Sequence, residues 1–195
     1  MKAFRSVTAR AAVLDRPDVD TDQIIPKQFL KRIERTGFGE FLFYDWRQDA
    51  AFELNRPEYA GAKILLTGPN FGCGSSREHA AWALQDYGYE VVVAPSFGDI
   101  FFSNAVQIGL VPVRLPASEL KELMRTGDAG GELTVDLEAE TIAADGGRTW
   151  RFEMDPFVRH SLLHGLDPIA RTLQREADIA AFEVRVPSPV ATTAL

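Results

Sequence analysis

The residues best suited to chemistry lie together in one short run, Gly68-Pro-Asn-Phe-Gly-Cys-Gly-Ser-Ser-Arg-Glu-His79. Gly72 and Gly74 let backbone N–H groups approach a ligand closely. Ser75 opens a Ser-x-x-Glu pattern, a capping-box signature, and this predicts a helix that begins at Ser75. The N–H groups and positive dipole end of such a helix attract anions, and Arg77 adds a planar fork suited to carboxylate or phosphate. The run therefore predicts an anion-binding turn.

On the residues alone, the same run also fits a strand-to-helix turn that binds nothing. No Gly-Lys-Ser/Thr closes it, so it is not a Walker loop, and the Gly-x-Ser-x-Gly pattern of a nucleophile elbow is absent. Ser75 and His79 lie four residues apart on one expected helix and lack an acid to orient the imidazole, which argues against a serine hydrolase. An anion site and a well-capped turn both stay open.

The elements that must position this run follow an alternating order. Buried-strand runs begin at Lys63, Val91 and Gly109, and helical runs lie between them over residues 77–87 and 97–108. Strands that alternate with helices predict a parallel sheet with helices packed against it. The glycine-rich run leads from the first of these strands into the first helix.

The rest of the chain predicts a smaller antiparallel section and C-terminal helices. Short alternating runs at 133–137, 141–144 and 148–154 predict antiparallel strands after a helix over 117–126. Further helices are expected over 156–164 and from Pro168 to about residue 181, the second capped by Asp167. The fold class is therefore α/β, a mostly parallel sheet flanked by helices with a smaller antiparallel section.

Length and composition favour one folded domain. The 195 residues suffice for one substantial core, and we expect a single domain over residues 1–185 with a loose tail over 186–195. We expect no signal peptide and no membrane partner, because no apolar run of about 18 residues occurs. The net charge of -7 is spread along the chain, which argues against a nucleic-acid partner.

The single cysteine, Cys73, limits both compartment and cofactors. It excludes an internal disulfide and, with no signal peptide expected, favours the cytoplasm. Iron–sulfur clusters take several thiolates, typically four. We therefore expect no cofactor on this chain, and any cluster must belong to a partner. Whether Cys73 faces a ligand or packs as a small residue stays open.

The run from Asn70 to His79 closely resembles the signature of the aconitase-family swivelling domain. Three further runs resemble the branch formed by bacterial isopropylmalate isomerase small subunits: Asp18-Val-Asp-Thr-Asp-Gln-Ile-Ile-Pro26, Thr36-Gly-Phe-Gly39 and Ser96-Phe-Gly-Asp-Ile-Phe-Phe-Ser-Asn104. The resemblance implies an aconitase-type swivelling β/β/α domain. In aconitase this domain is fused to cluster-bearing domains, whereas here it stands alone. A separate large subunit that carries a 4Fe-4S cluster is therefore implied.

The resemblance also implies roles for three residues of the run. Ser75 is expected to act as the base that takes a proton from the carbon beside a carboxylate, while Ser76 and Arg77 bind substrate carboxylate. The implied reaction interconverts 2-isopropylmalate and 3-isopropylmalate, both hydroxy-dicarboxylates, by loss and re-addition of water in leucine biosynthesis. Serine is a poor base in water, so its alkoxide needs stabilisation from backbone N–H groups and Arg77.

A basic stretch over residues 27–35 interrupts an otherwise acidic chain. A charged run is ordinarily a solvated face. The resemblance, however, places substrate specificity in the loop after the Ile-Ile-Pro run, so we expect Leu30, Lys31 and Arg32 to bind substrate. The family's upstream arginine corresponds to Arg10 or Arg16, and both stay open. Dehydratases of citraconate, dimethylmaleate or homoaconitate are alternatives, as is a non-catalytic anion-binding module.

Two clusters of potential metal ligands lack the rest of their motifs. Asp18, Asp20 and Asp22 imitate the start of a calcium loop, but its later glycine and glutamate positions hold other residues. The resemblance places this segment beside the active site, where it is expected to orient the loop that follows and to meet the large subunit. Side-chain capping of a turn is the alternative role expected for at least one of the three aspartates. His160 and His164 lack the glutamate of His-Glu-x-x-His, so we predict no metal there.

The stretch after the basic loop is rich in aromatic residues. We expect these side chains to lie in the core or to contact a partner, and they are Phe38, Phe41, Phe43, Tyr44 and Trp46.

Overall fold

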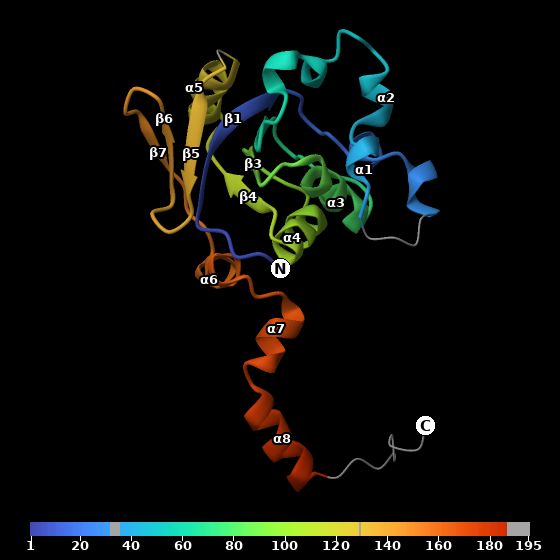
Figure 1. Cartoon of the computed structure of the whole chain (residues 1–195), viewed down its shortest axis with the longest axis vertical. Coiled ribbons are helices and arrows are strands. Elements are labelled where there is room, and N and C mark those ends of the chain that lie inside the picture. The colour runs from blue at the N-terminus through green and yellow to red at the C-terminus, as the bar shows by residue number, and fades with distance from the viewer. Residues whose placement is uncertain (32–35, 129, 187–195) are drawn as a thin grey trace.

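The computed structural model describes residues 1–31, 36–128 and 130–186. The centre of the fold is a seven-stranded sheet in the order β4-β3-β2-β1-β5-β6-β7 (Figure 1). The strands are β1 (Ser6–Leu14), β2 (Ile64–Thr67), β3 (Val91–Ala94), β4 (Val111–Arg114), β5 (Glu132–Asp136), β6 (Thr141–Ala144) and β7 (Thr149–Arg151). The expected parallel and antiparallel sections are thus two halves of one sheet.

Helices connect and cover these strands. The α-helices are α1 (Thr21–Ile24), α2 (Tyr44–Arg47), α3 (Glu78–Tyr87), α4 (Asp99–Ile108), α5 (Ala117–Asp128), α6 (Pro156–His164), α7 (Pro168–Leu173) and α8 (Glu176–Arg185). Short 3-10 helices are η1 (Lys27–Lys31), η2 (Gly39–Phe41), η3 (Glu53–Asn55) and η4 (Pro57–Tyr59). None of the helices in these described ranges has the length and apolar character that crossing a bilayer requires.

Strand β1 joins the two halves of the sheet. Its residues Ser6–Arg10 pair antiparallel with β5, and Ala11–Leu14 pair parallel with β2. The side chains alternate between exposed and buried in the first half and are all buried in the second. A strand in a parallel sheet is covered on both faces, whereas an antiparallel strand can leave one face in water. The change from alternating to continuous apolar residues therefore marks the change of pairing.

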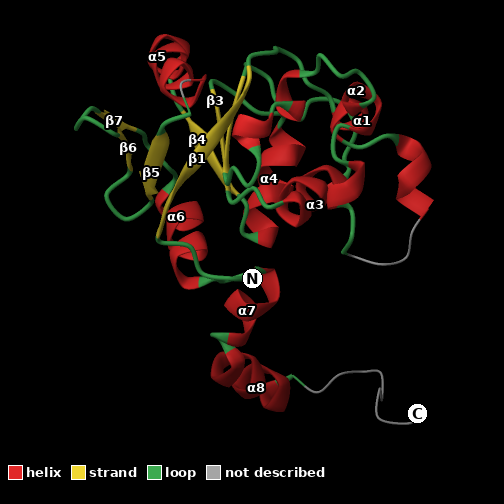
Figure 2. Ribbon diagram, turned by 45° about the horizontal axis from the view of Figure 1, so that its top comes forward, coloured by secondary structure: helices red, strands yellow, loops and turns green. Residues whose placement is uncertain are grey.

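Helices cover the two faces of the parallel half. Figure 2 shows α3 and α4 together on one side of the sheet and α5 on the other. Helix α5 packs closely, since a Cβ added at Gly127 would lie 3.1 Å from Val13 and 3.4 Å from Leu66. Strands β2 and β3 are consequently buried along their whole length.

The segment between β1 and β2 folds mainly through aromatic packing. Phe38 and Phe43 are fully buried, and Phe41 and Trp46 pack against the core. Phe29 stacks on Phe41 with ring centroids 4.1 Å apart. These contacts confirm the core role expected for the aromatic stretch, although Tyr44 keeps an exposed edge.

The C-terminal part departs from the sequence-based expectation in one respect. Asp155 and Asp167 cap α6 and α7 as N-cap residues with bound backbone N–H groups. The single helix expected from Pro168 to about residue 181 is instead two helices, because the chain turns at Gln174 and Arg175. Both run away from the body of the molecule (Figure 1), and we call residues 168–186 the arm. Apart from Val186, the expected loose tail lies outside the described residues.

Candidate active site

The candidate site is built on residues 68–77, here called the glycine loop, which join β2 to α3. The backbone of Asn70, Gly72 and Gly74 is left-handed, with φ of 59°, 73° and 93°. Glycine is required at position 72, since a Cβ there would lie 2.2 Å from the ring of Phe101. The loop therefore passes directly over α4.

Backbone hydrogen bonds hold the glycine loop between two neighbouring segments. The N–H of Gly72 donates to the carbonyl of Val19 at 2.7 Å, and the N–H of Thr21 donates to the carbonyl of Cys73 at 2.9 Å. On the other side, the N–H of Phe71 donates to the carbonyl of Ser96 at 3.1 Å. Three of the four runs that carry the family resemblance thus meet at this loop.

The start of the following helix differs from the prediction. Helix α3 begins at Glu78 with Arg77 as its N-cap residue and no side-chain cap. The predicted capping role of Ser75 is therefore wrong. Instead, the N–H of Arg77 donates to the carbonyl of Ser75 at 2.8 Å, and the hydroxyl of Thr21 also donates to that carbonyl at 3.3 Å. Ser75 therefore lies before the helix, in a turn that the hydroxyl of Thr21 also holds.

Ser75, Ser76 and Arg77 follow one another at the end of the loop. Both serines are exposed, whereas the side chain of Arg77 is 19% exposed and forms an ion pair with Asp22. The Nη1 atom of Arg77 is buried and has no hydrogen-bond partner of ordinary geometry in the described part of the chain. Its desolvated charge therefore depends on the Asp22 carboxylate.

The three aspartates at the start of α1, two before the helix and one within it, each have a separate role. Asp18, with left-handed φ of 55°, accepts a hydrogen bond from Nδ2 of Asn70 at 2.7 Å. Asp20 caps α1 by accepting from the N–H of Gln23 at 2.8 Å, and Gln23 completes the capping box. Asp22 reaches Arg77. The expected cap is confirmed, and the acidic segment lies against the candidate site.

Cys73 and His79 have perturbed ionisation. Burial raises the pKa of the Cys73 thiol, and the carboxylates of Asp20 and Asp18 raise it further. Burial lowers the pKa of His79, whose ring packs 5.2 Å from Phe38 and 4.7 Å from Trp82. Near neutral pH, Cys73 is therefore a thiol and His79 an uncharged aromatic packing group.

The expected specificity residues lie on a different element. Leu30 and Lys31 belong to η1, where Leu30 packs against the core and Lys31 is exposed. Within the described ranges, no hydrogen bond or ion pair joins these two residues to the glycine loop. Arg32 lies outside the described residues. Their role in substrate binding stays a prediction.

The two candidates for the upstream arginine differ in their surroundings. Nε and Nη2 of Arg16 donate to the two carboxylate oxygens of Glu53 at 2.9 and 2.8 Å, and the guanidinium also lies 4.6 Å from the ring centroid of Trp46. Arg10 is an exposed residue in the middle of β1. The backbone of Arg16 lies against the start of the glycine loop, since a Cβ at Gly68 would be 2.3 Å from the Arg16 carbonyl oxygen, while two of its guanidinium N–H groups are used by Glu53.

The histidine pair lies away from this site, on α6. The rings of His160 and His164 are 4.2 Å apart, and Nδ1 of His164 is within hydrogen-bond distance of the His160 carbonyl. Among the described residues, no group of three or more histidine, cysteine or acidic side chains is arranged to hold a metal ion.

The glycine loop carries side chains that can bind a carboxylate. A guanidinium with one branch anchored can bind a carboxylate through its remaining N–H groups. Two hydroxyls stand exposed beside it, free of any capping role. The site can therefore hold a carboxylate next to a hydroxyl.

Two family models match this chain. The model described as "Aconitase C-terminal domain" matches residues 1–118, and the LeuD_N model matches residues 121–156. The first match contains the whole glycine loop and the segments that hold it.

Curated relatives match over nearly the full chain. The 3-isopropylmalate dehydratase small subunit of Geobacillus kaustophilus is 54% identical over 192 residues, which cover 95% of this chain and 98% of that protein. The proteins of the same name from Rhodopirellula baltica and Bacillus subtilis are 56% and 52% identical, over 94% of this chain in both cases and 98% and 96% of the relative.

A solved structure has the same fold. The crystal structure of 3-isopropylmalate dehydratase (LeuD) from Methanocaldococcus jannaschii matches with a TM-score of 0.70 and 28% identity. The match covers 91% of this chain and 99% of that one.

Proposed function

This chain belongs to the family of 3-isopropylmalate dehydratase small subunits, and we propose that it supplies one side of an active site completed by a separate large subunit. As a member of this family it is a subunit of a hydro-lyase. The observation that carries the proposal is the exposed pair Ser75 and Ser76 beside the anchored guanidinium of Arg77. This half-site has an arginine for a carboxylate and two hydroxyls within reach of what it binds.

The reaction we propose converts 2-isopropylmalate into 3-isopropylmalate, and the reverse, within leucine biosynthesis. Water is lost from the hydroxy-dicarboxylate and added again at the neighbouring carbon. The step that this chain must catalyse is removal and return of a proton on the carbon beside a carboxylate. The cytoplasm is the compartment we propose, as suits a single unpaired cysteine.

We assign Ser75 as the base and Ser76 and Arg77 as the carboxylate-binding residues. The assignment of Ser75 as the base is supported by the absence of a side-chain cap on α3. The Ser75 hydroxyl oxygen accepts no hydrogen bond from the first N–H groups of that helix. The nearby Arg77 charge stabilises an alkoxide, and this lowers the cost of deprotonating serine. Binding of the substrate carboxylate by Arg77 would place the adjacent carbon beside the two hydroxyls.

The metal chemistry is assigned to the partner. This chain has one cysteine, Cys73, which cannot supply the thiolates of a four-iron cluster. Burial and two nearby carboxylates raise the pKa of this thiol, and a raised pKa disfavours the thiolate that iron requires. We therefore propose that a 4Fe-4S cluster on the large subunit supplies the Lewis acid for the substrate hydroxyl.

Recognition of the substrate side group is assigned to the segment after α1. We propose that Leu30, Lys31 and Arg32 select it, because η1 follows directly from the segment that holds Arg77. An apolar pocket discriminates between two substrates that differ by one methylene by about 1–3 kcal/mol of transition-state binding free energy. Exchange of residues 29–32 for those of a related dehydratase should therefore change the ratio of kcat/KM between substrates more than kcat itself.

The test is reconstitution of this chain with its cognate large subunit under anaerobic conditions. We expect iron and sulfide on the large subunit only, no turnover by either chain alone, and turnover of 3-isopropylmalate by the pair. Citraconate, dimethylmaleate and homoaconitate, each supplied as the hydrated or dehydrated form, serve as comparison substrates. Stoichiometric iron on this chain alone, or a pair that turns over none of these compounds, would refute the proposal.

A further inference from the structure

Thr21 binds the glycine loop through two separate hydrogen bonds. Its N–H donates to the carbonyl of Cys73 at 2.9 Å, and its hydroxyl donates to the carbonyl of Ser75 at 3.3 Å. Thr21 is the first residue of α1, and the N–H of a first helical residue has no partner within its own helix. That N–H is therefore available to the loop. The two bonds hold the carbonyls on either side of Gly74.

The position of Thr21 is fixed by its own neighbours. Asp20 caps α1 and also pairs with Cys73 in a strand-like bridge. Ile24, at the other end of the short helix, is fully buried in the core, and only 1% of Thr21 is exposed. The hydroxyl of Thr21 thus reaches the loop from a buried and fixed backbone.

A second buried threonine shows what is particular about Thr21. Buried hydroxyl groups in proteins are normally hydrogen-bonded. Thr67, at the end of β2, is 0% exposed, and its Oγ1 has no hydrogen-bond partner within the described ranges. Thr21 donates its hydroxyl proton to the Ser75 carbonyl. The two side chains are alike in type and burial and differ in this bond.

The bond from Thr21 restricts the turn that carries the proposed base. The Ser75 carbonyl also accepts from the N–H of Arg77 at 2.8 Å, and this bond closes a three-residue turn. A planar peptide unit can rotate only about the two soft dihedrals beside it. Two donors on the carbonyl oxygen therefore fix the peptide unit between Ser75 and Ser76. Its rotation sets the directions in which both serine side chains leave the backbone.

We propose that Thr21 is a positioning residue, whose hydroxyl fixes the Ser75 carbonyl and thereby directs the Ser75 hydroxyl toward the carbon that loses its proton. This inference rests on the proposed function, in which Ser75 is the base. Proton transfer requires a base within hydrogen-bond reach of the proton. A misplacement of about 1 Å can lower a rate by about 100-fold. Because Thr21 is buried, it acts through Ser75 and does not touch the substrate.

The experiment measures kcat, KM and the deuterium isotope effect of the reconstituted enzyme, for each assembled pair of subunits. Thr21→Val keeps the shape of the side chain and removes the donor. We expect kcat to fall by at least about tenfold and KM to change by less than about threefold. The isotope effect of deuterium on the reacting carbon should increase, because proton transfer becomes the slow step. A merely structural role would lower the amount of assembled enzyme and leave this isotope effect unchanged.

Conservative and matched variants separate this bond from its surroundings. Thr21→Ser keeps the hydroxyl, and its kcat should stay within about threefold of the parent. If Thr21→Val does not assemble, Thr21→Ser and Thr21→Ala, which differ only in the hydroxyl, give the same comparison. Thr67→Val removes the buried hydroxyl that binds nothing in the described part of the chain, and it should leave kcat unchanged.

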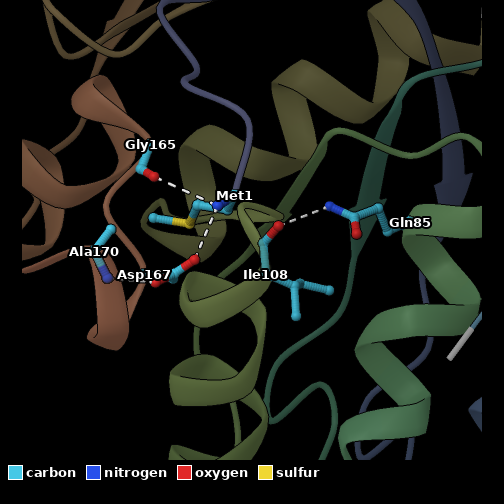
Figure 3. A network of polar contacts seen from close by, with 6 residues as sticks. All are labelled: Met1, Gln85, Ile108, Gly165, Asp167 and Ala170. Atoms are coloured by element: carbon cyan, nitrogen blue, oxygen red, sulfur yellow. Dashed lines mark hydrogen bonds and ion pairs between the residues drawn. The ribbon is translucent and has the colours of Figure 1, made fainter.

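A second control removes a bond of the same kind far from the loop. Nε2 of Gln85 donates to the carbonyl of Ile108 at 3.0 Å, near the C-terminal end of α3 (Figure 3). Gln85→Met removes this donor and keeps the length of the side chain. Its kcat and its isotope effect should equal those of the parent.

Addition of Thr21→Val to Ser75→Ala tests whether Thr21 acts through the base. We expect the double variant to be within about twofold of Ser75→Ala, because a residue that positions a missing hydroxyl has no further effect. A parental kcat in Thr21→Val, a Thr21→Ser enzyme as slow as Thr21→Val, or a loss that recurs in full in the Ser75→Ala background would each overturn the inference and leave the proposed function intact. A parental rate for Ser75→Ala would overturn the assignment of the base, and the inference with it.

Discussion

The carboxylate of Asp22 on α1 forms an ion pair with Nη1 of Arg77 at the end of the glycine loop. The Arg77 side chain is 19% exposed and that of Asp22 is 53% exposed, so the pair reaches from the interior to the surface. The buried Nη1 atom of Arg77 is thus the branch that pairs with Asp22, the more exposed partner. We interpret Asp22 as a positioning residue that fixes one branch of Arg77 and directs the rest toward substrate carboxylate.

Replacement of Asp22 should therefore weaken substrate binding. In the reconstituted enzyme, we expect Asp22→Ala to raise KM by about tenfold with a smaller change in kcat, because the anchoring pair is lost while the base remains. Asp22→Asn keeps an acceptor oxygen, so its KM should lie between that of the parent and that of Asp22→Ala. Asp15→Ala removes an exposed carboxylate of the same segment and should leave KM unchanged. A fall in KM for Asp22→Ala would show that Asp22 competes with the substrate instead.

Arg77 should require its planar fork as well as its charge. Arg77→Lys keeps the charge but loses bidentate geometry, so we expect KM to rise by at least about tenfold while kcat falls less. Arg125→Lys, at an exposed position of α5, is the matched control. Equal KM values for Arg77→Lys and the parent would argue that the guanidinium does not bind the substrate.

The difference between predicted and observed capping leads to a stability test. The side chain of Asp20 caps α1, whereas that of Ser75 does not cap α3. We expect Asp20→Ala to lower the free energy of unfolding by about 0.5–2 kcal/mol and Ser75→Ala to change it by less than about 0.5 kcal/mol. Urea unfolding of the isolated chain measures both, and Asp20→Ser should recover most of the loss. If Ser75→Ala costs as much as Asp20→Ala, Ser75 has a structural role that the geometry does not reveal.

Cys73 should be a slow nucleophile. Its raised pKa leaves less thiolate at a given pH, so alkylation by iodoacetamide should rise with pH through a midpoint above that of glutathione. Asp18→Asn removes one of the carboxylate charges and keeps an oxygen for Asn70, so it should move the midpoint to lower pH. A midpoint for the parent at or below that of glutathione would contradict this account.

The sequence predicts the parallel half of the sheet well because its signals are local. Continuous apolar runs mark β2 and β3, and the change in the pattern of β1 coincides with its change of partner. The fold class is confirmed, although the single sheet divides evenly between parallel and antiparallel pairs. The break between α7 and α8 has no local signal in the sequence. It falls at Gln174 and Arg175, and neither is a helix-breaking glycine or proline.

The candidate site depends on contacts between segments that are far apart in the sequence. The Ser-x-x-Glu pattern predicts a cap at Ser75, but Thr21 and the left-handed Gly74 fix an additional turn before α3. The pairing of Asp22 with Arg77 joins residues far apart in the sequence, and neither is unusual in its own surroundings. Only the docking of the acidic segment on the glycine loop, through the carbonyls of Val19 and Cys73, brings them together.

The turnover of reconstituted enzyme that carries Ser75→Ala tests the central claim most directly. We predict that this variant assembles with the large subunit and binds 3-isopropylmalate as the parent does, while kcat falls by at least about 100-fold, because the base is missing. Ser76→Ala, at the adjacent exposed hydroxyl, should instead act mainly on KM. A Ser75→Ala enzyme that assembles and turns over at close to the parental rate would contradict the assignment of Ser75 as the base.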